Sequence, residues 1–257
     1  TSLDIGIFYV VAVTSVSEMA VFMAGWSSNN KFALFGAMRA VAQLVSYEVP
    51  LVLATVGVVI VAGSLSLVKI VEAQTVPFVF MQPLGFAIFI IAVSAELNRT
   101  PFDLLEAESE LVTGYHIEYS GMKFGMFYLA EYLAALAYSA VISTLFLSGW
   151  QGPLLPSYVW FLIKVLFVFF LFIWVRATLP RVRIDQIMAL AWKFLLPLAL
   201  INIAITSIEA LVLPDFPWYL APVNIVIGVL VTWGLAAAFR SVWEPRWRPR
   251  QLAPAPT

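Results

Sequence analysis

Four glutamates lie within or at the edge of long apolar stretches of this chain: Glu18, Glu48, Glu96 and Glu131. An ionised carboxylate in hydrocarbon costs at least a few kcal/mol, so a glutamate in such a stretch needs a hydrogen-bonded or functional role. Burial and nearby like charges disfavour the ionised form, and such groups can then hold and release protons near neutral pH. These residues therefore predict a proton relay, which the hydroxyls of Tyr47 and Tyr132 could extend. Lys164 is either a counter-charge for this relay or a side chain that snorkels outward.

The four glutamates are expected at related depths. Glu18 and Glu131 each lie eight residues from the inner end of their predicted spans, which is about 12 Å along a helix. Glu48 and Glu96 fall near the inner ends of two further spans. The alternative is that each carboxyl only hydrogen-bonds a neighbouring helix. Four carboxyls on consecutive spans, all in the inner half of the membrane, favour a shared proton route over four separate packing contacts.

Composition places these residues in a membrane protein. The 257 residues are 62% hydrophobic and 11% charged, whereas soluble domains carry about 25% charged residues. Residues 49–68, 73–95, 132–163 and 216–239 contain no charged side chain, and each is long enough to cross about 30 Å of hydrocarbon as a helix. The net charge of −1 gives no indication of nucleic-acid binding. With no cysteine and one histidine, His116, this chain alone supplies no thiolate cluster, bis-histidine haem or zinc site.

The predicted fold is therefore all-α: one membrane domain over residues 1–257, built as a polytopic helical bundle. We predict seven spans, near 5–26, 40–66, 78–97, 123–148, 158–178, 188–213 and 218–240, with the second beginning as early as Lys31. Basic residues gather in alternate loops, so the N-terminus of this chain is expected outside and the C-terminus inside. The inside then includes an acidic loop, 96–122, and an arginine-rich tail, 240–257.

The acidic loop opposes the basic bias of inner loops, which indicates a specific use. Residues 96–118 hold six acids against one arginine, Arg99. Asp103 as N-cap with Glu106 three residues later predicts a short amphipathic helix that ends near Gly114. Glu108 would lie in the middle of its apolar face. Glu106 and Glu110 would point the other way, either as a solvated face or as a partner contact.

This loop resembles the quinone-loop signature of complex I membrane subunit 1, the H-subunit family of NADH–quinone oxidoreductases. The segments that carry the resemblance are ELNRTPFDLLEAESEL at 96–111 and GYHIEYSG at 114–121. Further similar segments are GWSSNNK at 25–31, GAMRA at 36–40, SYE at 46–48, GWQGP at 149–153 and RATLPRVRIDQ at 176–186. The resemblance extends to about residue 213.

The resemblance implies a membrane subunit beneath a hydrophilic arm, with inner loops that line the tunnel for the substrate quinone. It implies no cofactor in this chain; NADH, FMN and the iron–sulfur clusters belong to partner subunits, with small membrane-arm subunits and lipid as the other partners. The intramembrane glutamates named above match those of the family. The quinone chamber and inner loops are implied for Arg99, Phe102, Asp103, Glu106, Glu108, Glu110, Glu118, Arg181, Arg183 and Asp185.

The family begins with two further spans, so this chain is expected to be truncated, and residues 218–257 extend beyond many members. Its expected function is that of one component of a proton-translocating NADH:quinone reductase, not catalytic alone, in a prokaryotic plasma membrane rather than a mitochondrial one. Three alternatives stay open. They are a related component of an energy-converting hydrogenase, a free-standing secondary transporter, and a scaffold whose acids only pair helices.

Overall fold

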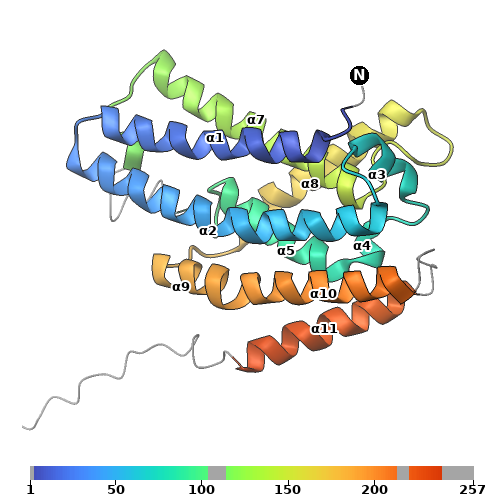
Figure 1. Ribbon diagram of the computed structural model, residues 1–257. Helices are drawn as coiled ribbons and strands as arrows, with labels where there is room; N and C mark the ends of the chain where they lie inside the picture. The colour runs from blue at the N-terminus through green and yellow to red at the C-terminus, as the bar shows by residue number, and fades with distance from the viewer. Residues whose placement is uncertain (1–2, 104–113, 213–219, 239–257) are drawn as a thin grey trace, which may run out of the picture.

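The computed structural model describes residues 3–103, 114–212 and 220–238, and all secondary structure within these ranges is helical. Six of the described helical segments are long and apolar enough to cross a membrane, and a seventh apolar helix is shorter. The long helices lie roughly along one direction, side by side (Figure 1). This confirms the predicted all-α polytopic bundle. The acidic-loop end of the bundle holds residues 97–103 and 114–121, and the opposite end holds residues 63–82 and 147–156.

The first two helices form an antiparallel pair that turns at the acidic-loop end. Helix α1 covers Gly6–Ser27 and α2 covers Lys31–Ala62. The side chain of Asn30 caps α2 by accepting a hydrogen bond of 3.0 Å from the backbone N–H of Phe32. Gly63, in the left-handed region with φ of 64°, ends it. Helix α2 thus takes the earlier of the two starts considered from the sequence and continues through Pro50.

The third predicted span is broken. A short helix, α3, covers Leu67–Ala73. Helix α4 then covers Phe78–Met81 and α5 covers Pro83–Glu96, with Gln82 between them at φ −130° and ψ 61°. Pro83 has no N–H and disfavours helical geometry at the residue before it, which explains the break. The sequence predicted one continuous helix over 78–97; the structure instead has a backbone break near the opposite end.

The remaining helices complete the bundle. A 3₁₀ turn, η1, covers Gly114–His116, α7 covers Met122–Phe146 and α8 covers Ser157–Thr178. Helix α9, Ile184–Ala189, passes through a π-helical turn, Leu190–Leu195, into α10, Leu196–Val212. Helix α11 covers Leu220–Ala238. Figure 1 shows α10 and α11 along one side of the bundle, with α2 next to α10.

Helices α1 and α2 approach so closely at Gly25 that no larger side chain fits there. A Cβ on Gly25 would lie 2.3 Å from the Cβ of Ala37 and 2.9 Å from the carbonyl oxygen of Ala33. We therefore expect Gly25→Ala to lower the free energy of unfolding by about 1–3 kcal/mol through overpacking. The measurement is the thermal midpoint of the protein in detergent. Gly234→Ala, whose Cβ would meet nothing within 4 Å, is the control, and equal midpoints for both variants would contradict this packing.

Candidate functional site

Three of the four predicted glutamates meet within the bundle, and we refer to Glu18, Glu48 and Glu96 as the carboxyl cluster. Glu18 on α1 is buried, with 7% of its surface exposed. A side-chain hydrogen bond joins it to Glu48 on α2, and the hydroxyl of Ser15 donates a hydrogen bond to Glu48 Oε1. These contacts bring the Glu18 and Glu48 carboxyl groups together between α1 and α2.

Glu96, at the end of α5, extends the cluster to α7. Its carboxyl hydrogen-bonds Tyr138, which also hydrogen-bonds Thr14 on α1. Within the described residues, Glu96 Oε2 and Glu18 Oε1 are buried without a hydrogen-bond partner. Sequence reasoning missed Tyr138. Its spacing of seven residues from Glu131, which places both on one face of a helix, was the available signal.

The other predicted relay residues lie outside the cluster. The hydroxyl of Tyr47 donates a 2.9 Å hydrogen bond to the backbone oxygen of Ile187. The ring of Tyr132 lies against the guanidinium of Arg99. Lys164 Nζ donates a 2.7 Å hydrogen bond to the backbone oxygen of Gln151 at the opposite end. Lys164 is thus held by a loop and is not placed as a counter-charge for the cluster. The Tyr47 hydrogen bond connects α2 to α9 and does not connect two carboxyl groups.

Glu131 forms an ion pair with the acidic loop. Arg99 Nε lies 2.8 Å from Glu131 Oε1, and the Arg99 guanidinium carbon is 4.6 Å from the centroid of the Tyr132 ring. Arg99 is buried, with 8% of its surface exposed, so Glu131 and Tyr132 stabilise its positive charge in place of water. The pair connects the start of the acidic loop to α7 at Glu131. Glu131 lies about two helical turns before Tyr138 on the same helix.

A cavity of about 420 Å³ brings the ion pair and the cluster together. It opens between α1, α7 and the end of α5, and Glu96, Glu131 and Tyr138 all contribute to its wall. Most of the remaining lining is apolar: Val13, Ala20, Val21, Leu44, Leu97, Phe127, Ala130 and Ala134. Glu96 is thus in contact with both the cavity and the carboxyl cluster.

The two loops at the acidic-loop end contact each other. The backbone N–H of Val182 donates a 3.0 Å hydrogen bond to the oxygen of Pro101, which places the segment with Arg181, Arg183 and Asp185 beside the segment 99–103. Phe102 is buried against Tyr47, with ring centroids 5.5 Å apart, and Asp103 is partly buried. Glu118 accepts a 2.8 Å hydrogen bond from Asn30. Glu106, Glu108 and Glu110, with the predicted amphipathic helix, lie outside the described residues.

Gln43 on α2 holds the acidic loop and was not singled out from the sequence. Its fully buried Nε2 donates hydrogen bonds of 2.8 Å to the oxygen of Ala95 and 2.9 Å to that of Phe102. We expect Gln43→Leu to remove both of these hydrogen bonds and to speed amide hydrogen exchange over residues 95–103 at least tenfold, by mass spectrometry. The exposed Gln186→Leu is the control. Unchanged protection in Gln43→Leu would show that the loop is held by other contacts.

The comparisons with known proteins agree with this architecture. Residues 1–207 match the family model described as NADH dehydrogenase. A relative from Dehalococcoides mccartyi strain CBDB1 is 60% identical over 242 residues, which cover 94% of this chain and 68% of the relative. Relatives from Carboxydothermus hydrogenoformans and Geobacillus kaustophilus are each 54% identical, covering 80% of this chain and 60% and 63% of their own lengths.

All three relatives carry the name of the H subunit of NADH-quinone oxidoreductase. The chain spans 68% of the first of them and less than two thirds of the other two. The match covers the acidic loop, the carboxyl cluster and the helices that carry them. This chain therefore belongs to the family of complex I membrane subunits that includes the H subunit of NADH-quinone oxidoreductase, the family that its acidic loop resembles.

Proposed function

We propose that this chain forms part of the quinone chamber of a complex I and couples quinone reduction to proton movement through its carboxyl cluster. The observation that carries the proposal is the position of Glu96, which lines the 420 Å³ cavity and belongs to the cluster. The names of the relatives support the substrate class. Their bacterial sources support a prokaryotic plasma membrane, in which the N-terminus of this chain would face outside.

The cavity suits a quinone headgroup. Its volume falls in the range of about 300–1,000 Å³ that small-molecule sites occupy, and such sites combine apolar walls with a few polar groups. Here apolar side chains form most of the wall, while Asn98, Tyr115 and Tyr138 offer polar groups that could hydrogen-bond quinone oxygens. Electrons would come from an iron–sulfur cluster of the hydrophilic arm, whose FMN accepts them from NADH, because this chain has no cysteine. The loops at the acidic-loop end would contact that arm.

Coupling would follow from charge. Two-electron reduction of a quinone consumes two protons, and the transient negative charge at the cavity would favour proton uptake by Glu96. Because Glu96, Glu48 and Glu18 interact, protonation of one changes the proton occupancy of the others. Through this linkage, quinone binding or reduction in the cavity would change the proton occupancy of Glu48 and Glu18 without a redox centre in this chain.

The alternatives from the sequence make different predictions. A component of a hydrogenase would co-purify with a nickel–iron protein instead of a flavin-bearing NADH module. A free-standing transporter would be active alone after reconstitution. A scaffold would tolerate Glu→Gln changes at every member of the carboxyl cluster. The cavity beside Glu96 favours the quinone reductase over a scaffold, because helix pairing needs no such volume.

A cavity-filling substitution tests the chamber directly. Ala130 lines the cavity, so Ala130→Trp should fill part of it and raise the KM for a short-chain quinone at least tenfold, about 1.4 kcal/mol. A photoreactive quinone should also label this chain less strongly. Ala204→Trp, at an exposed position of α10 that does not line the cavity, is the control. If Ala130→Trp left both KM and labelling unchanged, quinone would have to bind elsewhere.

A further inference from the structure

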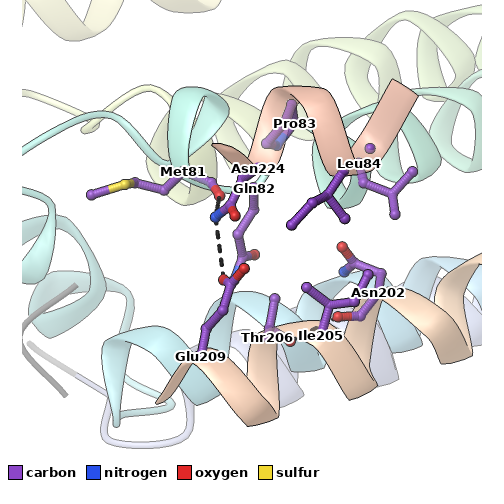
Figure 2. A pocket seen from close by; sticks show the side chains of 11 residues that line it. Met81, Gln82, Pro83, Leu84, Asn202, Ile205, Thr206, Glu209 and Asn224 are labelled. Carbon is purple, nitrogen blue, oxygen red and sulfur yellow. Dashed lines mark hydrogen bonds between the residues drawn. The ribbon is translucent and has the colours of Figure 1, made fainter. Parts of the chain in front are cut away.

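A second buried polar site lies at the opposite end, where the helix break faces α10 and α11. Asn224 on α11 donates hydrogen bonds of 2.7 Å to the backbone oxygen of Met81 and 3.2 Å to Glu209 Oε2. Gln82, the residue at the break, donates a 3.1 Å hydrogen bond to the backbone oxygen of Gly57 on α2. Figure 2 shows these side chains converging from the break, α10 and α11.

Three polar atoms in this site are buried and have no hydrogen-bond partner among the described residues. They are Gln82 Oε1, Asn202 Nδ2 and Asn224 Oδ1, on side chains that are 3%, 3% and 8% exposed. Buried polar atoms in folded proteins almost always have a partner, either protein or ordered water. Two acceptors and one donor around one cavity therefore indicate a site for a small polar ligand.

The cavity is the size of one water molecule. The centre of a water molecule can occupy a volume of about 20 Å³ within this cavity. A cavity needs about 10–15 Å³ of such volume to hold one water molecule. Two glycines leave room for the Asn202 amide in its wall. A Cβ on Gly57 would lie 3.1 Å from Asn202 Nδ2, and a Cβ on Gly85 would lie 3.2 Å from it. Larger residues at either position would press on the Asn202 amide.

We propose that this cavity binds one water molecule, which accepts a hydrogen bond from Asn202 and donates to Gln82 and Asn224. A sodium ion would match the two amide oxygens and the Glu209 carboxylate, but it would face the N–H donor of Asn202. Water satisfies a mixed set of donors and acceptors, and a cation does not. The site is at the other end of the bundle from the quinone cavity, so it goes beyond the proposed function.

The bound water would explain how the bundle tolerates both a broken helix and a carboxyl at this depth. Irregular backbone occurs within membranes where it is buried in protein or lines a hydrated cavity. Gln82 supplies that irregular backbone, and Asn224 connects the same cavity to the Glu209 carboxyl. The water would thus complete a hydrogen-bonded group that runs from α10 through the break to α11.

A high-resolution structure of the assembled complex tests the site. We expect one density peak within about 2.7–3.2 Å of Gln82 Oε1, Asn202 Nδ2 and Asn224 Oδ1. An empty cavity would overturn the proposal. So would a peak that contacts oxygen atoms alone at shorter distances and that appears only in sodium-containing buffer, because that is a cation site. Quinone reduction is not the readout, so this result is independent of the proposed function.

Infrared spectroscopy of variants gives a second test. Glu209→Gln identifies the carboxyl band of Glu209 in difference spectra of the complex. We expect Asn202→Leu, which removes a partner of the water, and Gly85→Ala, which displaces the Asn202 amide, to shift that band and to abolish the density peak. Gly234→Ala makes the same chemical change where a Cβ would meet nothing within 4 Å, and it should change neither. A Glu209 band that stays in place in Asn202→Leu would overturn the proposal.

Discussion

Arg99→Met is expected to lower the amount of assembled complex and its quinone reductase rate by at least tenfold. The substitution keeps a long apolar stem but removes the guanidinium that lies 2.8 Å from Glu131 and against Tyr132. Removing one partner of a fully buried ion pair costs about 3–5 kcal/mol. The cost is smaller here because the Glu131 side chain is 25% exposed, yet a tenfold effect requires only about 1.4 kcal/mol.

The double variant Arg99→Met, Glu131→Gln separates the effect of the ion pair on assembly from its effect on the quinone reductase rate. Replacing both partners avoids leaving a carboxylate beside an apolar side chain, so assembly should return to near the wild-type level. The quinone reductase rate should recover less than assembly, because Glu131 lines the proposed quinone cavity and Arg99 contacts Glu131. Assembly is measured by native electrophoresis and the rate with a short-chain quinone. If Arg99→Met assembled and turned over normally, the ion pair would be incidental.

The helical bundle was predictable because hydrophobicity over about 20 residues is a local property of the sequence. The spans predicted near 123–148 and 158–178 therefore match α7 and α8 to within a few residues. The break at Gln82 was not predicted, although Pro83 was visible. Proline is common at the first position of a helix and also occurs inside kinked helices, so Pro83 alone did not indicate whether the span would break at Gln82.

The candidate site was predictable in part, for a similar reason. A carboxyl in an apolar span is conspicuous, so Glu18, Glu48 and Glu96 were singled out from the sequence, and the structure places them beside one another. Gln43 and Tyr138 were missed because a glutamine or tyrosine is common in helices, and their partners exist only once distant segments fold together. Lys164 was assigned to the relay from its depth alone, yet its ammonium contacts a loop oxygen. Depth predicts the layer of a residue, but not the direction of its side chain.

Glu96→Gln is expected to reduce proton pumping per electron more than tenfold in reconstituted vesicles. Glutamine fills the same space and can hydrogen-bond Tyr138, but it cannot take up or release a proton in the neutral pH range. Within the described residues, Glu96 is the cluster carboxyl that also lines the cavity, so its loss would separate quinone chemistry from Glu18 and Glu48. Quinone reduction should fall less than pumping, because the cavity keeps its shape.

Two further variants make this prediction specific to the cluster. Tyr138→Phe keeps every carboxyl and removes one hydrogen bond, so pumping should fall only about threefold, in line with the roughly 0.5–1.5 kcal/mol of a single bond. Glu72→Gln, at an exposed position of α3 near the opposite end, should pump as the wild type does. The measurement is the ratio of protons moved to NADH oxidised. A wild-type ratio in Glu96→Gln would mean that protons reach the bundle by a route that avoids Glu96, and the cluster would then serve only to hold α1, α2, α5 and α7 together.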